Sequence, residues 1–112
     1  MDKLERYRQA IKQIITESAV GGRSNAVEYE TQVVFDDQRG HYFLYGVGWL
    51  NEKRIHGCTL HFDLKADKIW VQEDWTEEGA ASKLEALGVP KSDIVLAFRS
   101  PYIREYTGYA VA

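Results

Sequence analysis

The 112-residue sequence has a single cysteine, Cys58, only two prolines and no long apolar run. One cysteine cannot form an internal disulfide, and a lone thiol is typical of a reducing compartment, so we expect a cytoplasmic protein. No stretch approaches the roughly 20 apolar residues that a membrane helix needs. The charged first residues also lack the apolar core of a signal peptide, so we expect no contact with a membrane.

The sequence also lacks an excess of positive charge, with 14 Lys and Arg against 17 Asp and Glu. The excess negative charge lies between residues 66 and 93, around Glu73, Asp74, Glu77 and Glu78. Nonspecific binding to duplex DNA needs a basic face that releases counterions, and none is visible. DNA binding is therefore the alternative interpretation. The acidic stretch is either solvated charge or a surface for a basic partner.

The sequence contains enough hydrophobic residues to form the core of one domain over residues 1–112. Hydrophobic residues make up 45%, and three Trp, seven Tyr and four Phe supply large side chains for a core. A compact domain of this length has a radius of gyration of roughly 13 Å. Disorder is excluded by this composition.

The first third of the sequence predicts one helix followed by a strand. From Lys3 to Ser18 apolar residues recur at steps of three and four, the stripe of an amphipathic helix. The stripe consists of Leu4, Tyr7, Ile11, Ile14 and Ile15. Asp2 is placed to cap the helix and Gly21-Gly22 to end it. Val27 to Asp36 alternates with the period of a half-solvated strand.

The segment from His41 to Leu50, reached through a turn at Asp37–Gly40, predicts a strand that is apolar on both faces. One face carries Phe43, Tyr45, Val47 and Trp49, and the other carries Tyr42, Leu44, Gly46, Gly48 and Leu50. Such a strand is usually central and covered on both sides. The two glycines would let another backbone approach closely, either a helix of this chain or a second subunit.

Two more strands are predicted, one that follows a turn at Asn51-Glu52-Lys53 and runs to about Lys65, and one from Lys68 to Asp74, joined by a tight turn at Ala66-Asp67. This turn places Leu60 opposite Glu73. The expected core face is Cys58, Leu60, Phe62, Leu64, Ile69 and Val71. The expected outer face is His61, Asp63, Trp70, Gln72 and Asp74. A slip by one residue would bury Asp63 and Asp74, which favours this register.

After the fourth strand the sequence predicts a helix, a short buried strand and a final helical turn. Thr76 is expected to cap the helix, with the next two glutamates in its first turn and Gly88 at its end. Residues 94–98 are wholly apolar, and Ser100-Pro101 starts the last helical turn. The fold class is therefore α+β: a mostly antiparallel sheet of four consecutive strands plus one later strand, with the N-terminal helix and the second helix packed on it.

The sequence contains His, Cys and acidic residues of the types that act in catalysis or bind metals, but they form no known catalytic pattern. His56 with Cys58, and His61 with Asp63, each share a strand face as metal ligands do, yet the odd spacing puts the two pairs on opposite faces. Acids near Trp75 stand where a helix start normally carries them. There is no GxSxG, GxGxxG or P-loop. We expect no catalytic residue, no metal and no cofactor.

Several apolar residues are expected at positions outside the core of the folded monomer. An outward Trp70 resembles the aromatic anchors of protein interfaces, with helix cover inside the monomer as the alternative. The apolar last residues 109–112 are expected to pair as an edge strand or to fill a groove, in this chain or in a partner. The predicted partner interface is Gly46, Gly48, Trp70, Trp75, Tyr109 and Val111.

The sequence resembles the XisI family, the fdxN-element excision controlling factors. The segments that carry the resemblance are MDKLERYRQAIKQI, HYFLYGVGW, RIHGCTLHFDLKADKIWVQED, TEEGAASKLEALGVPKSDIVLAF and SPYIREYTGYAVA. They cover nearly the whole chain in matching order, and only the region around Val20–Asn25 is uninformative. The family pattern favours Asp-Gly where this chain has Ala66-Asp67, which argues against a type I′ turn, and histidine where this chain has Arg99.

The resemblance implies an accessory factor for programmed excision of a DNA element in differentiating nitrogen-fixing bacteria. Such a factor acts beside a site-specific recombinase, which cleaves the strands, and beside a companion factor encoded nearby. The resemblance implies no catalytic or ligand residues. Our leading hypothesis is a non-enzymatic regulatory protein that binds its companion and self-associates.

Two other hypotheses make distinct demands on the fold. A DNA-binding factor that positions the recombinase would need phosphate contacts that converge on one face. The candidates for these contacts are Arg39, Lys53, Arg54, Arg99 and Arg104. An enzyme would need a deep pocket that combines His61 and Asp63 with Asp74 or Glu73.

Overall fold

The computed structural model describes residues 2–20 and 27–112. Its elements are α1 (Lys3–Val20), β1 (Val27–Asp36), β2 (His41–Leu50), β3 (Lys53–Lys65), β4 (Lys68–Asp74), α2 (Ala80–Ala86), the 3-10 helix η1 (Lys91–Asp93), β5 (Ile94–Leu96) and α3 (Pro101–Arg104). The predicted α+β class and element order are confirmed. The predicted helix stop at Gly21-Gly22 lies outside the described residues. Among those that are described, no helix is long and apolar enough to cross a bilayer.

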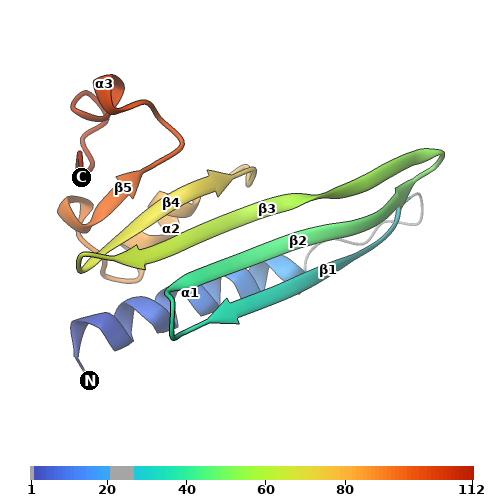
Figure 1. Cartoon of the computed structure of the whole chain (residues 1–112), viewed down its shortest axis with the longest axis horizontal. Helices are drawn as coiled ribbons and strands as arrows, with labels where there is room; N and C mark the ends of the chain where they lie inside the picture. Colours follow the sequence, from blue (N-terminus) through green and yellow to red (C-terminus); the bar gives the residue numbers. More distant parts are fainter. Residues whose placement is uncertain (1, 21–26) are drawn as a thin grey trace.

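The strands form one sheet in the order β1-β2-β3-β4-β5, antiparallel except for the parallel pair β4–β5. Figure 1 views this sheet from the side away from α1 and α2, which both lie behind it. Helix α1 packs against β1, β2 and β3, and α2 packs against β4 and α1. We call the side of the sheet that faces the helices the inner face, and the opposite side the outer face.

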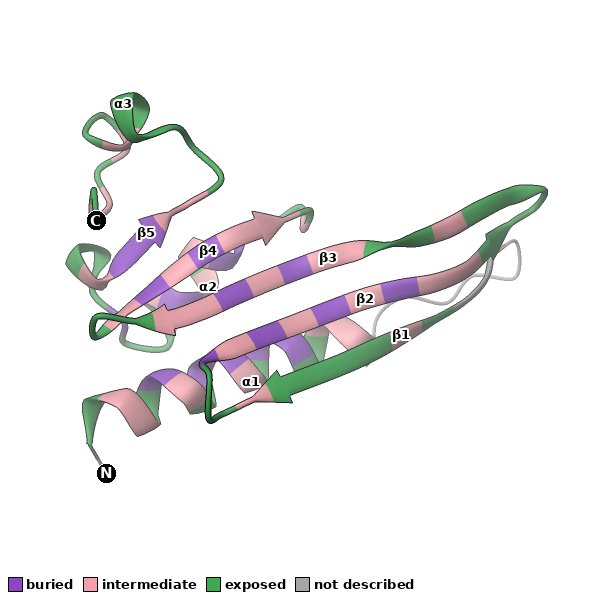
Figure 2. Cartoon of the chain, in the orientation of Figure 1, coloured by how far each residue is buried: buried purple, intermediate pink, exposed green. Residues whose placement is uncertain are grey.

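The core lies between the inner face and the two helices, as the purple residues of Figure 2 show. Its strand residues, all at most 2% exposed, are Tyr42, Leu44, Leu60, Phe62, Ile69, Val71 and Ile94. Its helix residues include Ile11, Ile14 and Ile15 of the predicted α1 stripe. Each such side chain contributes about 1.5–3 kcal/mol by leaving water. Asp2 caps α1 as predicted, because its Oδ1 accepts from the Glu5 N–H at 2.8 Å.

Two β-bulges change the register that we predicted for β3 and β4. Leu64 faces Ile69 and Phe62 faces Val71 as expected, but Leu60 pairs with Asp74 instead of Glu73. One extra residue on β4 causes this shift, and one extra residue on β3 pairs Cys58 with Tyr45. Cys58 therefore lies with Tyr45 on the outer face, and the prediction that it belongs to the core is wrong.

The same shift turns Asp74 from the outer face to the inner face, where it replaces the cap that we predicted for α2. The Asp74 Oδ2 accepts from the Ala80 N–H at 2.7 Å, and its Oδ1 accepts from the Thr76 hydroxyl. The expectations that Thr76 caps this helix and that two glutamates occupy its first turn are wrong, since α2 begins only at Ala80. Gly88 follows its end with φ 94°, as predicted.

Two tight turns, one at Ala66-Asp67 and one that ends at Gly40, meet at one end of the sheet, which we call the near end. Ala66 and Asp67 have φ of 52° and 60°, the type I′ conformation, despite the absence of the favoured glycine. Gly40, in the β1–β2 turn, has φ 74°, and its carbonyl accepts from the Leu64 N–H at 2.8 Å. A Cβ at Gly40 would stand 2.5 Å from the Leu64 carbonyl oxygen, so only glycine lets these turns meet.

At the opposite end of the sheet, which we call the far end, strands β2 and β3 extend past the end of β4. β4 pairs with β3 only as far as Leu60, so the tip of the β2–β3 hairpin continues beyond β4 (Figure 1). The molecule measures 42 × 34 × 24 Å, and its radius of gyration of 14.7 Å exceeds the roughly 13 Å expected for a compact chain of this length. We call residues 47–57 the arm.

Candidate functional site

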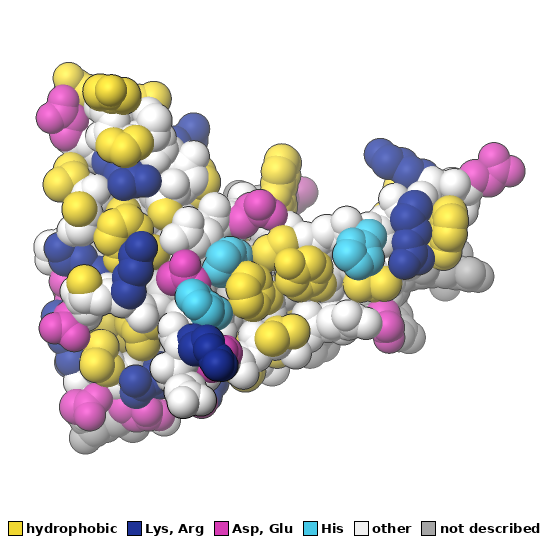
Figure 3. Space-filling view, viewed as in Figure 1, with side chains coloured by type: hydrophobic (Ala, Val, Ile, Leu, Met, Phe, Trp, Pro, Cys, Tyr) yellow, Lys and Arg dark blue, Asp and Glu magenta, His cyan; other side chains and the backbone are white. Residues whose placement is uncertain are grey.

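The outer face of β2 has no helix over it among the described residues. The prediction that this strand is covered on both sides is therefore wrong for one side, because α1 and α2 both pack on the inner face (Figure 1). Phe43, Tyr45 and Val47 stand on the outer face and are only half-buried. Figure 3 shows hydrophobic side chains gathered over the middle of β2 and β3, with histidines at both ends of the patch.

The strand register assembles this patch from two segments. Phe43 pairs with His61, Tyr45 with Cys58, and Val47 with His56. The ring centroids of Phe43 and His61 lie 4.2 Å apart, and those of Phe43 and Tyr45 lie 6.0 Å apart. Aromatic side chains at these spacings shield one another and stay ordered without a helix above them. We call Phe43, Tyr45, Val47, His56 and His61 the aromatic face.

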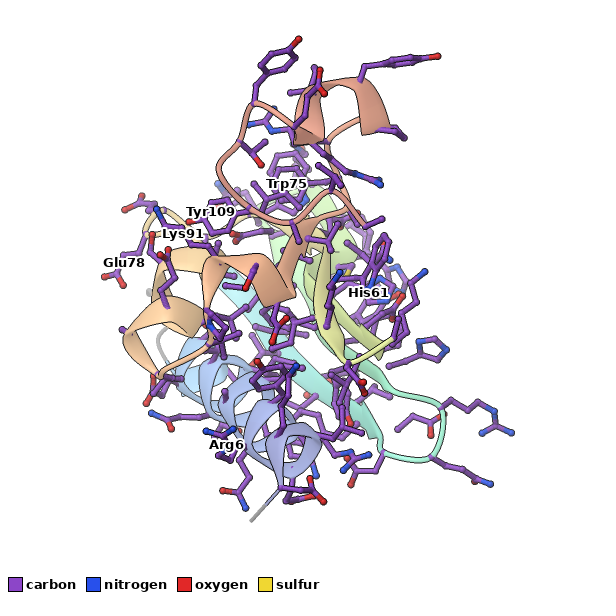
Figure 4. The ribbon with its side chains drawn as sticks, turned by 90° about the vertical axis from the view of Figure 1, so that its left-hand side faces the viewer. Arg6, His61, Trp75, Glu78, Lys91 and Tyr109 are labelled. Atoms are coloured by element: carbon purple, nitrogen blue, oxygen red, sulfur yellow. The ribbon has the colours of Figure 1, made fainter. Side chains whose placement is uncertain are left out.

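A polar cluster borders the aromatic face at the near end of the sheet. Asp63 Oδ1 lies 2.7 Å from His41 Nδ1 and 2.8 Å from His61 Nε2. The Gln72 amide donates to Asp63 Oδ2 at 3.1 Å. Burial acts to raise the pKa of Asp63, but hydrogen bonds to the two histidines outweigh it and hold this pKa below its ordinary value. Figure 4 shows His61 on the side of the sheet away from the helices.

Trp70 lies on the outer face as predicted, opposite Asp63, but it is not free. Its ring is flanked by Lys65 Nζ at 4.1 Å and by the Arg104 guanidinium at 5.7 Å. Arg104 also donates to the Ala97 carbonyl at 3.2 Å, which ties α3 to the end of β5. The C-terminal segment therefore covers part of this tryptophan.

The Trp75 side chain is exposed (76% for the residue) and lies beside the arm, and the backbone N–H of Trp75 donates to the Thr59 carbonyl at 3.0 Å. It lines an open groove of about 690 Å³ together with Gly46, Ile55 and Gly57. Gly46 pairs with Gly57 on β3, so the floor of this groove is bare backbone. The groove combines two of the predicted interface residues, Gly46 and Trp75, and Gly48 lies in the adjoining part of β2.

The C-terminal residues dock within the chain. Ala110 forms a parallel bridge to Val95, and its N–H donates to the Ile94 carbonyl at 2.9 Å. The Tyr109 hydroxyl donates to Glu85 Oε2 at 2.7 Å, and Figure 4 shows Tyr109 close to Lys91 on the helix side. Val111 remains 53% exposed. Tyr109 and Val111 thus lie at the β5 edge, away from the aromatic face.

The pocket that an enzyme would need does not form around the predicted residues. Glu73 and Asp74 line a hollow of about 300 Å³ with Gln72 and Trp75, and neither His61 nor Asp63 lines it. Both Asp74 oxygens accept hydrogen bonds from the start of α2 and the turn before it. These bonds give the Asp74 carboxylate a structural role at the start of α2.

The basic residues that would contact DNA do not converge. Arg39 lies in the turn before β2, whereas Lys53 and Arg54 pair with the far end of that strand. A ten-residue strand separates its ends by about 30 Å. Arg54 stacks on Trp49 at 5.3 Å at the tip of the arm, and Arg104 is engaged by Trp70. No single basic face results from these placements.

The sequence matches the XisI protein family over residues 1–111. The chain belongs to this family. It is similar to a XisI-like protein from Anabaena variabilis ATCC 29413, at 40% identity and a TM-score of 0.88, over 97% of this chain and 99% of the other. It is also similar to the fdxN element excision controlling factor XisI from the same organism, at 32% identity and a TM-score of 0.85, over 99% and 100%. No curated protein sequence matches the chain.

In this XisI-family protein the six predicted interface residues fall into three places. Gly46 and Trp75 line the groove, with Gly48 next to it in the arm. Trp70 lies against Arg104 of the C-terminal segment, and the remaining two lie at the β5 edge. The aromatic face was not among the predicted residues, although the double apolar pattern of β2 pointed to it. His41 was missed altogether, because only the pairing of β2 with β3 brings it to Asp63.

Proposed function

We propose that this XisI-family protein is a non-enzymatic accessory factor in programmed excision of a DNA element, and that its aromatic face binds a companion excision factor. A separate site-specific recombinase cleaves the DNA, and this protein controls it by assembling with the companion in the cytoplasm. The proposal draws its process from the family and from a similar protein described as an fdxN element excision controlling factor.

The observation that carries the proposal is the uncovered apolar surface at the centre of the sheet. Phe43, Tyr45 and Val47 have no partner element over them among residues 2–20 and 27–112. Rigid aromatic side chains on a fixed strand lose little entropy when a partner covers them, which is why they dominate binding energy at interfaces. The polar cluster of His41, His61 and Asp63 supplies a rim on one side.

The test is binding of the purified chain to the companion factor, measured by isothermal titration calorimetry. The double variant Phe43→Glu, Tyr45→Glu puts two charges into the centre of the proposed interface. Each hot-spot residue is worth about 2 kcal/mol, so we expect the affinity to fall by more than about 100-fold. Leu87→Glu, at a 42% exposed position beside α2, is the matched control and leaves the affinity unchanged.

Three results would overturn the proposal. The first is failure of the wild-type chain to bind the companion. The second is equal binding by the double variant and the wild type. The third is a dimer mass by light scattering that the double variant reduces to the mass of one chain while companion binding stays intact. Binding to duplex DNA that falls steeply with salt and survives the double variant would favour the DNA-binding alternative.

A further inference from the structure

The polar cluster beside the aromatic face has the donor set of a metal centre. His41 Nδ1, His61 Nε2 and Asp63 Oδ1 all lie within 4.8 Å of one another. Two imidazole nitrogens and one carboxylate oxygen suit first-row divalent metals, and three protein ligands on one side leave the other coordination positions open. Neighbouring ligands in a six-coordinate site with bonds near 2.1 Å lie about 3 Å apart. The separations of 2.7 and 2.8 Å are already close to that value.

The backbone brings the three side chains together. His41 and Asp63 are directly paired across β2 and β3, and His61 precedes Asp63 by two residues on the same face of β3. Gly40 directly precedes β2 and packs against Leu64, which is possible only because glycine has no Cβ. This contact fixes the start of β2. The site is therefore built on paired strands, where ligand positions are more precise than on loops.

Neighbouring side chains hold the ligands in orientation. The Gln72 amide donates to Asp63 Oδ2, which leaves Oδ1 directed at the two histidines. Phe43 packs on the His61 ring at 4.2 Å and restrains its rotation. Partners of this kind are the usual outer support of metal ligands. The exposed fraction of the side chains rises from 14% at Asp63 through 25% at His61 to 45% at His41, so the cluster opens to solvent on one side.

We propose that His41, His61 and Asp63 bind a divalent transition metal ion of the Zn²⁺ or Fe²⁺ kind, with the remaining positions open to water or to a ligand atom from another molecule. The metal replaces the hydrogen bonds that now join Asp63 to the histidines. This inference does not depend on the proposed binding of a companion factor.

The test uses chelator-treated full-length protein titrated with Zn²⁺ by calorimetry and with Co²⁺ by visible absorption. We expect one ion per chain and a Co²⁺ spectrum of mixed nitrogen and oxygen ligands. Asp63→Asn and His61→Ala should weaken binding by more than about 100-fold, beyond what loss of an outer-shell partner costs. Gln72→Ala should weaken binding by about 10-fold.

Matched controls come from His56 and Cys58, which the bulge on β3 brings to the same face as His61 and Asp63, so the prediction that the two pairs lie on opposite faces is wrong. His56 is a histidine of the aromatic face outside the cluster, and Cys58 lies beside it, so His56→Ala and Cys58→Ser should leave the affinity unchanged. In the wild type, Co²⁺ should broaden the ring signals of His41 and His61 in NMR spectra and spare those of His56, a readout that needs no variant. Absence of binding at 100 µM metal, broadening centred on His56, or retention of affinity in folded Asp63→Asn would each overturn the proposal.

Discussion

The two faces of β2 carry similar side chains but have opposite surroundings. Tyr42 and Leu44 on the inner face are at most 2% exposed beneath α1. Phe43 and Tyr45, their immediate neighbours, are only partly buried on the outer face. Helix α1 has one apolar stripe and α2 is short, so the helices cover one side of the sheet only. Hydrophobicity alone therefore does not separate the buried face of β2 from its outer face. The two faces differ in whether a helix packs over them.

This comparison predicts that a Phe→Ala truncation lowers the free energy of unfolding much more on the inner face of the sheet than on the outer face. Phe62→Ala removes a fully buried ring and should lower the free energy of unfolding by about 3–5 kcal/mol. Phe43→Ala removes a ring that neighbours only partly enclose, and we expect a loss of about 1 kcal/mol. Urea unfolding followed by circular dichroism measures both. Equal losses would mean that the outer face is as much core as the inner face.

A polar contact in the helix layer gives the next largest effect. The Tyr7 hydroxyl of α1 donates to Asp93 of η1, and Lys3 Nζ lies 2.9 Å from the same carboxylate. Burial acts to raise the pKa of Asp93, but Tyr7 and Lys3 outweigh it and hold this pKa below its ordinary value. Asp93→Asn should lower the free energy of unfolding by about 1–2 kcal/mol at pH 7.

The pH dependence of this effect has a defined sign. A carboxylate whose pKa is lower in the folded state than in the unfolded state stabilises the fold above the unfolded value, near 4, and loses this contribution as the pH falls through its folded value. The stability difference between wild type and Asp93→Asn should thus be constant from pH 7 to about pH 5 and shrink below pH 4. A difference that grows on acidification would contradict the assignment.

The elements of the fold could be predicted because their signals are local. The stripe of α1, the alternation of β1 and the turn residues between strands fixed most boundaries to within two residues. The bulges could not be predicted, because one inserted residue breaks no apolar pattern until the partner strand is known. The bulge on β3 accounts for the wrong placement of Cys58, and the bulge on β4 accounts for that of Asp74 and for the wrong cap of α2.

The candidate sites depended on contacts between strands, which the sequence shows only indirectly. His61 and Asp63 were visible as a pair because they lie two residues apart on one strand. His41 lies 22 residues before Asp63 and reaches it only through the β2–β3 register. The aromatic face was visible as a pattern, but the sequence does not show on which side of the sheet a helix packs, and α1 and α2 both pack on the inner face.

The smallest effect concerns the bulged residue Cys58 on the outer face. Burial first, and the negative charge of Glu73 second, raise the pKa of its thiol to about 11. Because the thiolate is the nucleophile, alkylation by iodoacetamide at pH 8 should be slow relative to a free thiol. Glu73→Gln removes the smaller cause, and a partly solvated charge is worth about 0.2–1 kcal/mol, so the rate should rise about 1.4- to 5-fold.

Mass spectrometry of the modified protein over time measures this rate, and Glu77→Gln is the matched control. Glu77 is an exposed acid beyond the end of β4, and the pKa of Cys58 owes nothing to it, so its removal should leave the rate unchanged. If Cys58 instead faced the core, as the unbulged register requires, both variants would react at the slow wild-type rate. A rise confined to Glu73→Gln would place the thiol and the Glu73 carboxylate on the same side of the sheet.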